Sequence, residues 1–158
     1  MAAVKAIALD VDGVLTDGGV FWGPGGEEWK RFSFADIMGV SLARKAGLIV
    51  TLISGEDSPL VDRFAAKMSI PEITKGCKDK AAALRAFAER NQLQLAEIAF
   101  MGDDVNDLAA MQAAGLSAAP HDARPAARKQ ASIVTAARGG NGAVRELVDH
   151  ILAERSHS

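Results

Sequence analysis

Ala6-Ile7-Ala8-Leu9-Asp10-Val11-Asp12-Gly13 places two carboxylates directly after a wholly apolar run. A short apolar run that ends at turn residues is typical of a strand buried on both faces of a parallel sheet. Because side chains along a strand alternate between faces, Asp10 and Asp12 reach one site only if the chain bends after Asp10, and Gly13 permits that bend. Two close carboxylates both ionise readily when a cation neutralises them. The stretch therefore predicts a divalent metal and a carboxylate nucleophile.

The composition is that of an ordinary globular domain. The 158 residues are 49% hydrophobic and 24% charged, with a net charge of -2. This balance predicts a single domain over residues 1–158 and argues against nucleic-acid or membrane-surface binding. No apolar run approaches the ~20 residues of a membrane span, and the first residues do not read as a cleaved signal. Cys77 is the sole cysteine, so a reducing cytoplasm is the expected location.

Apolar runs alternate with helical patterns along most of the chain. This alternation predicts an α/β fold, a doubly wound parallel sheet with helices on both faces. Strands are expected at 4–9, 48–53, 98–101, 116–119 and 133–134, and helices at about 36–46, from 58, 79–91, after 101 as far as 115, and 142–153.

Residues 18–32 interrupt the alternation. The segment contains both tryptophans around the turn Gly23-Pro24-Gly25-Gly26, which predicts a projecting β-hairpin. So aromatic a hairpin either packs on its own domain or pairs with another subunit. The subunit contact is favoured, because aromatic residues are enriched in the cores of interfaces.

Polar residues follow three of the predicted strands, where parallel sheets bind ligands. Phosphoryl transfer needs a nucleophile, an acid for the leaving oxygen, and cations for the phosphate oxygens. Asp10 is the expected nucleophile and forms an aspartyl-phosphate, while Asp12 is the expected general acid and base. The carboxylates of Asp10 and Asp103, with the backbone carbonyl of Asp12, are the expected ligands of Mg²⁺.

The phosphate itself needs donors. Ser54, Gly55 and Lys80 are the candidates, through a hydroxyl, an amide and an ammonium group. Asp104 or Asp107 is expected to hold Lys80 or a metal-bound water in place. Asn106 either contacts phosphate or caps a helix. These residue types occur in the order Asp10, Asp12, Ser54, Gly55, Lys80, Asp103, Asp104, Asn106, Asp107.

These motifs resemble those of haloacid dehalogenase (HAD) superfamily phosphatases, which have a Rossmann-like fold. The pattern is Asp10-Val11-Asp12, then Ser54, then Lys80, then Gly102 to Asp107. The gaps after the first motif and after Ser54 are each about twenty residues, too short for a cap domain. The resemblance implies the roles given above and Mg²⁺ as the cofactor.

The hairpin, Asp36, and the glycine-rich tail at about 138–158 are similar to the capless KDO 8-phosphate phosphatase group, which includes KDN 9-phosphate phosphatases. That resemblance implies a homotetramer in which hairpins and tails close neighbouring active sites. It implies substrate contacts at Glu56, Lys67 and Asp36. Glu56 stands where KDO 8-phosphate phosphatases carry arginine, which favours a nine-carbon acid, and Phe64 stands where arginine is usual. Glu56 and Lys67 also fit an exposed charge pair.

Two further functions are compatible with clustered aspartates. One is a phosphoacceptor signalling domain, although its acceptor usually follows the third strand and Asp12 promotes turnover. The other is a non-catalytic oligomerisation module of a sugar-nucleotide synthetase, against which the intact set of Asp10, Asp12, Lys80 and Asp103 argues.

Overall fold

A six-stranded parallel sheet forms the centre of the computed structural model, which describes residues 2–157. The strand order is β5-β4-β1-β6-β7-β8, so the strand that carries the acidic motif lies in the middle of the sheet. The strands are β1 (Ala6–Leu9), β4 (Ile49–Ile53), β5 (Ile73–Thr74), β6 (Ile98–Met101), β7 (Leu116–Ala119) and β8 (Ile133–Val134).

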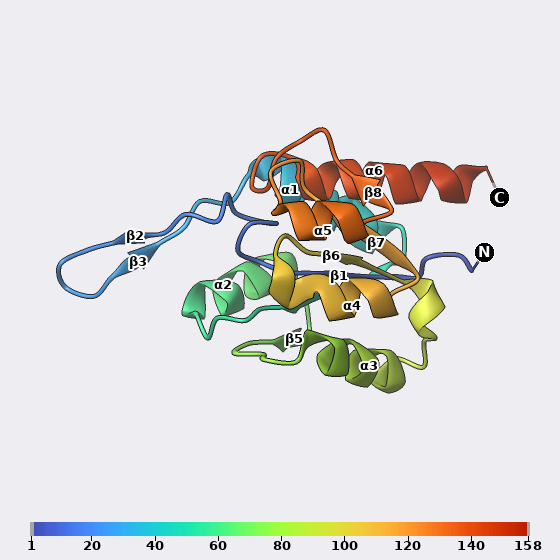
Figure 1. Cartoon of the computed structure of the whole chain (residues 1–158), viewed down its shortest axis with the longest axis horizontal. Helices are drawn as coiled ribbons and strands as arrows, with labels where there is room; N and C mark the ends of the chain where they lie inside the picture. Colours follow the sequence, from blue (N-terminus) through green and yellow to red (C-terminus); the bar gives the residue numbers. More distant parts are fainter. Residues whose placement is uncertain (1, 158) are drawn as a thin grey trace.

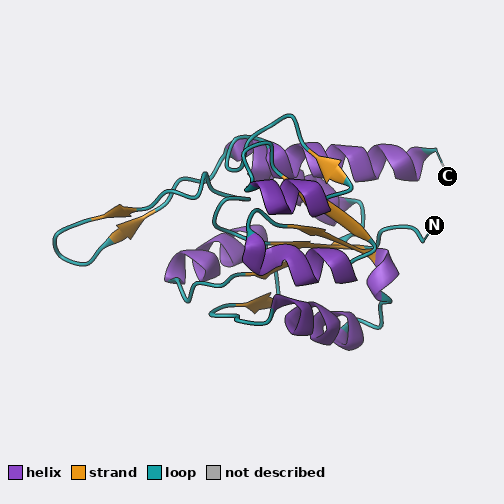
Figure 2. Cartoon of the chain, viewed as in Figure 1, coloured by secondary structure: helices purple, strands orange, loops and turns teal. Residues whose placement is uncertain are grey.

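Helices cover both faces of this sheet (Figures 1 and 2). One face is packed by α1 (Phe34–Lys45), α2 (Pro59–Met68) and α6 (Ala143–Ser156), and the other by α3 (Lys80–Arg90), α4 (Leu108–Ala113) and α5 (Pro125–Gln130). Two single-turn 3₁₀ helices, η1 (Leu95–Glu97) and η2 (Val105–Asp107), precede β6 and α4. The predicted doubly wound α/β fold is confirmed.

Strand β1 shows why the sheet is buried on both sides. Ile7 and Leu9 belong to the core beneath α1, α2 and α6, whereas Ala6 and Ala8 belong to the core beneath α3, α4 and α5. All four are at most 1% exposed. Small residues on one face and large ones on the other let helices pack at different depths, and the alternation follows from the two-residue period of a strand.

Helices α1 and α6 are joined by one buried carboxylate. Asp36 is 1% exposed, and its side chain accepts hydrogen bonds from the N–H of Gly142 at 3.3 Å and of Arg145 at 3.1 Å. It thereby satisfies orphan donors at the start of α6. Gly39 permits the close approach, since a Cβ there would lie 2.9 Å from Arg145 Cα.

The predicted hairpin is confirmed and projects far from the sheet (Figure 1). Its strands, β2 (Phe21–Trp22) and β3 (Glu28–Trp29), pair in antiparallel register with Phe21 opposite Trp29. Phe21 is 75% exposed and Trp22 is 77% exposed, so in the single chain the hairpin does not bury its aromatic side chains. At its base, Phe32 stacks on Phe64 of α2 with ring centroids 4.9 Å apart.

The expected elements are present, and three further ones, β5, α5 and η1, are additional to them. These three have two, six and three residues, and a hydrophobic period carries little information over so short a segment. Among residues 2–157, helices long and apolar enough to cross a bilayer are lacking.

Candidate active site

The candidate site lies at the carboxyl ends of β1, β4 and β6. Asp10 directly follows β1, and its N–H donates to the carbonyl of Met101 at the end of β6. The side chain is buried, and its Oδ1 accepts a 2.8 Å hydrogen bond from the N–H of Val11. The nucleophile candidate is thus fixed by the sheet core rather than by a mobile loop.

Lys80 connects the first acidic motif to the last. Its Nζ lies 3.0 Å from Asp10 Oδ1 and 2.8 Å from Asp107 Oδ1, and its side chain is 1% exposed. The other carboxylate oxygen of Asp107 accepts from the N–H of Asp103 at 2.8 Å. Asp107 therefore contacts both the lysine and the loop that carries Asp103.

The carboxylates repel one another in this buried place. Burial, followed by the charge of Asp107, raises the pKa of Asp10 well above its ordinary value, and Lys80 opposes the rise. Burial raises the pKa of Asp103 to about 6, with Asp107 adding to the rise. Burial lowers the pKa of Lys80, but Asp10 and Asp107 together raise it overall. One lysine does not neutralise this cluster.

The residues fit a divalent cation. Carboxylate oxygens of Asp10, Asp103 and Asp107 all lie within 4.8 Å of one another. Oxygen atoms are the ligands that Mg²⁺ prefers, and a cation there would relieve the repulsion that raises the two pKa values. Asp10 and Asp103 were predicted as ligands, whereas Asp107 was predicted only as a supporting residue. Because Asp107 already binds Lys80 and the Asp103 N–H, Asp10 and Asp103 are the better ligand pair.

The turn after Asp10 has no room for larger residues. Gly13 has φ +85°, and a Cβ there would lie 1.8 Å from Asp103 Oδ2. Thr16 Oγ1 accepts from the N–H of Gly13 and of Gly18. The tail backs this turn in the same chain, since a Cβ on Gly139 would lie 2.0 Å from the Gly13 carbonyl oxygen. The bend predicted at Gly13 is present.

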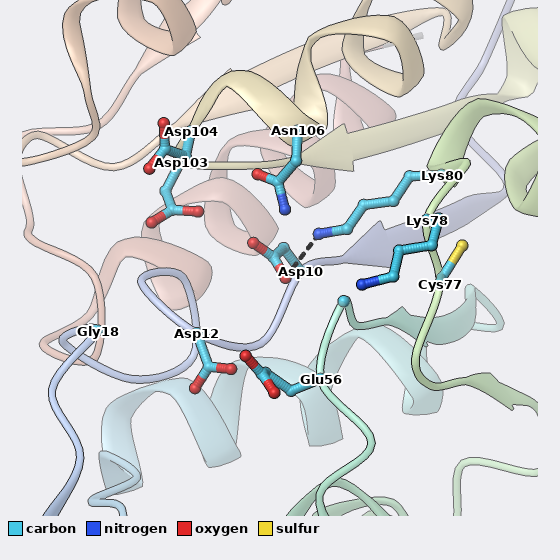
Figure 3. Close-up of a pocket in the computed structure, with 11 residues that line it drawn as sticks. Asp10, Asp12, Gly18, Glu56, Cys77, Lys78, Lys80, Asp103, Asp104 and Asn106 are labelled. Atoms are coloured by element: carbon cyan, nitrogen blue, oxygen red, sulfur yellow. Dashed lines mark ion pairs between the residues drawn. The ribbon is translucent and has the colours of Figure 1, made fainter.

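A cavity of about 410 Å³ opens above these groups (Figure 3). It is lined by Asp10, Asp12, Gly18, Gly55, Glu56, Cys77, Lys78, Lys80, Asp103, Asp104 and Asn106. Eight of the predicted site residues are among them. The volume falls within the range of ~300–1,000 Å³ that holds small-molecule ligands.

The structure places the remaining predicted residues elsewhere. Ser54 is fully buried, and its Oγ accepts from the N–H of Glu56, so it supports the turn that contains Gly55 and does not itself line the cavity. Asp107 lies behind the cavity. Lys67 lies on the exposed side of α2 and Asp36 lies between α1 and α6, so neither lines the cavity of this chain.

Sequence reasoning missed Lys30, which connects the hairpin to the site. Its Nζ lies 2.8 Å from Asp12 Oδ1 and 3.9 Å from Glu28 Oε2, and its side chain is 4% exposed. Glu28 in turn accepts a hydrogen bond from the Ser58 hydroxyl at the start of α2. Nothing in the local sequence marks this lysine, because the contact depends on the path of the hairpin.

The arrangement defines a carboxylate-based hydrolase on a doubly wound sheet. A sequence model of haloacid dehalogenase-like hydrolases matches residues 53–147. The chain belongs to this family, as its four motifs indicate.

Within the family, the chain is similar to 3-deoxy-D-manno-octulosonate 8-phosphate phosphatases. The enzyme of Escherichia coli strain K12 is 36% identical over 149 residues, which cover 94% of this chain and 79% of the relative. The crystal structure of the Moraxella catarrhalis enzyme, in complex with magnesium, phosphate and KDO, has a TM-score of 0.93 at 35% identity and covers 95% of this chain and 86% of that chain. The crystal structure of the Yersinia pestis enzyme has a TM-score of 0.95 at 35% identity, and the match covers 97% of this chain and 83% of that chain.

Proposed function

We propose that this chain is a Mg²⁺-dependent phosphatase that hydrolyses the terminal phosphate monoester of a 3-deoxy-2-ulosonic sugar acid. The observation that carries the proposal is the buried contact of Asp10, Lys80 and Asp107 beneath a cavity of about 410 Å³. The similarity to 3-deoxy-D-manno-octulosonate 8-phosphate phosphatases supports the substrate class.

In the first step, a carboxylate oxygen of Asp10 attacks phosphorus, and the bond from phosphorus to the ester oxygen breaks. Asp12, which lines the same cavity, gives a proton to the leaving alkoxide. In the second step, Asp12 takes a proton from water as the water attacks phosphorus of the aspartyl-phosphate. Inorganic phosphate leaves, and both carboxyl groups return to their starting states.

Other groups hold the phosphate during both steps. Asp10, Asp103 and the backbone carbonyl of Asp12 would hold Mg²⁺, which would supply positive charge to stabilise the phosphate. Lys80 keeps Asp10 oriented and donates to phosphate from the same ammonium group. Gly55 and Asn106 both line the cavity, and the N–H of Gly55 and the side-chain amide of Asn106 are the neutral donors that we assign to the phosphate.

The identity of the sugar acid depends on the entrance of the cavity. Glu56 is exposed there and lines the cavity, so it accepts hydrogen bonds from hydroxyl or amide groups rather than binding a carboxylate. This charge favours KDN 9-phosphate or an N-acylneuraminate 9-phosphate over KDO 8-phosphate. Lys67 and Asp36 contact the substrate only if a neighbouring subunit or a rearrangement brings them to it.

The exposed aromatic residues support self-association as a homotetramer. Phe21, Trp22 and Trp29 present apolar surface on the hairpin, and their own domain leaves each of them at least 65% exposed. Exposed aromatic residues of this density mark a protein–protein contact. Lys30 joins the base of the hairpin to Asp12, so a neighbouring chain that covered the hairpin as far as its base would also lie next to the cavity.

The test is phosphate release from KDO 8-phosphate, KDN 9-phosphate and N-acetylneuraminate 9-phosphate, measured at equal concentrations with Mg²⁺ and after exhaustive chelation. We expect many turnovers per chain with Mg²⁺, the highest kcat/KM on a 9-phosphate, and loss of activity on chelation. A single phosphate released per chain would instead indicate a phosphoacceptor domain. Equal activity on unrelated alkyl phosphates would remove the assignment to sugar acids.

A further inference from the structure

Lys78 is a second lysine in the active-site cavity, and the mechanism above gives it no role. It lies two residues before Lys80, in the loop between β5 and α3, and is exposed. Figure 3 shows its ammonium group pointing into the cavity, on the same side as that of Lys80. Two cations that lie two residues apart in the sequence, Lys78 and Lys80, therefore line the same cavity.

The two lysines differ in what already binds them. Lys80 is shared between Asp10 and Asp107 and is nearly inaccessible to solvent. Within residues 2–157, the ammonium group of Lys78 has neither an ion pair nor a hydrogen bond. It forms no ion pair even with Glu56, which lines the same cavity. Lys78 is therefore a cation whose charge is available to a ligand.

The loop that carries Lys78 is hydrogen-bonded to the turn at residues 54–56, which follows β4 and contains Gly55. The N–H of Cys77 donates to the carbonyl of Ser54 at 3.0 Å, and the N–H of Gly76 donates to the carbonyl of Glu56 at 3.2 Å. A Cβ on Gly55 would lie 3.8 Å from the carbonyl oxygen of Cys77. These contacts hold the backbone next to Lys78 against the amide that is expected to bind phosphate.

The charge of the cavity favours such a cation. Its lining includes five carboxylates, from Asp10, Asp12, Glu56, Asp103 and Asp104, against the ammonium groups of Lys78 and Lys80, and only Asp12 has a further cation, Lys30, beside it among the ion pairs of the described residues. A phosphate dianion that enters meets strong repulsion, and the charge of Lys80 is already offset by its two carboxylates. One divalent cation at Asp10 and Asp103 neutralises only part of the remainder.

We propose that Lys78 binds a non-bridging oxygen of the substrate's phosphate as a second cation beside Lys80, and so sets the affinity of the cavity for phosphate groups. The proposal rests on the proposed function for the identity of the reacting group. It extends that function to a residue outside the family's four motifs. The same contact binds the product, inorganic phosphate, and makes the enzyme sensitive to product inhibition.

The experiment compares Lys78→Gln, Lys78→Arg and a control, Lys129→Gln, which replaces an exposed lysine of α5 outside the cavity. Binding of inorganic phosphate is measured by titration calorimetry with saturating Mg²⁺, and kcat and KM are measured with p-nitrophenyl phosphate. For Lys78→Gln we expect Kd and KM to rise about tenfold, with kcat within about threefold of the parent, as loss of one exposed charged hydrogen bond implies. Lys78→Arg and Lys129→Gln should stay within about threefold of the parent.

An unchanged Kd for phosphate in Lys78→Gln overturns the proposal. A rise in KM for sugar-acid phosphates alone, with p-nitrophenyl phosphate unaffected, also overturns it, because the lysine then contacts another part of the substrate. Neither readout needs the sugar acid to be the substrate. Failure of the proposed function would appear separately, as phosphate binding and p-nitrophenyl phosphate hydrolysis without turnover of any sugar-acid phosphate.

Discussion

The acidic site and the β2–β3 hairpin are built in opposite ways. At the site, charged groups are buried: Asp10, Lys80 and Asp107 are each at most 5% exposed and contact one another. On the hairpin, apolar groups are exposed, with Phe21 and Trp22 more than 70% accessible. Each region thus reverses the usual preference of its residues, and each reversal has a free-energy cost in the isolated chain.

This contrast fits the two partners proposed above, a divalent cation for the site and a second chain for the hairpin. The buried carboxylates have raised pKa values, which a divalent cation would restore. The exposed aromatic side chains have apolar surface, which another protein chain would cover. The sheet core holds the first region rigidly, whereas the second depends on its base, where Phe32 meets Phe64 and Lys30 meets Asp12.

The largest expected effect concerns the site alone. Asp10→Asn removes the nucleophilic oxygen with little change in volume, and should lower kcat with p-nitrophenyl phosphate by more than about 10³-fold. Without metal at pH 7 the variant should melt no lower than the parent, because the lost charge is one that burial and Asp107 disfavour. Asp149→Asn, on the exposed side of α6, is the control and should match the parent. Parent-like turnover in Asp10→Asn would contradict the assignment of the nucleophile.

The effect of Mg²⁺ on the melting temperature tests whether the carboxylates of the site repel one another in the metal-free chain. The pKa of Asp103 is about 6 in the folded chain against an ordinary value of 3.8. Between these values the folded state holds a proton that the unfolded state has lost, so this group lowers the free energy of unfolding as pH rises through that window. Saturating Mg²⁺ should raise the melting temperature by about 5–10 °C at pH 7.5 and by less at pH 5. Equal shifts at both pH values would show that the carboxylates do not bind the ion.

The acidic residues at the centre of the site could be predicted from the sequence, because the patterns that mark them lie in the adjacent residues. Asp10 and Asp103 follow apolar runs that are typical of buried strands, and parallel strands bring their carboxyl ends to one edge. Lys80 was predicted only because the other motifs accompany it, since a lysine at the start of a helix is otherwise an ordinary surface residue. The hairpin was readable from its glycine-rich turn and clustered aromatic residues.

The rest depends on contacts between distant residues. Asp36 was expected to bind substrate, but its carboxylate accepts hydrogen bonds from the N–H groups of Gly142 and Arg145 at the start of α6. These residues lie more than a hundred positions away in the sequence, so no local pattern indicates the contact. The ion pair of Lys30 with Asp12 requires the hairpin to fold back over the first turn. Lys78 carries no motif and becomes informative only once its loop is seen against Gly55.

The hairpin should govern assembly and leave the fold of the domain unchanged. Replacing Phe21 and Trp22 together by serine should weaken self-association by more than about a hundredfold, as expected for two aromatic anchors of an interface. The melting temperature of the dissociated chain should stay close to that of the parent monomer, because neither side chain is buried in the single chain. Sedimentation velocity over a concentration series measures this, with Val134→Ser as the exposed apolar control. A monomeric parent, or an unchanged mass in the double variant, would show that the aromatic surface is not the contact.

The smallest effect is expected at the ion pair that joins the two regions. Lys30→Met keeps the length of the side chain but leaves Asp12 without its 2.8 Å partner, whereas Lys30→Arg keeps the charge. We expect kcat/KM of Lys30→Met to fall about fivefold to tenfold, and the free energy of unfolding to fall by about 1 kcal/mol, since the lysine is nearly buried and its carboxylate partner is not. Lys30→Arg should recover most of both losses. If Lys30→Met changed the mass of the assembly but not kcat/KM of the assembled enzyme, Lys30 would hold the hairpin without orienting Asp12, and the two regions would be independent in catalysis.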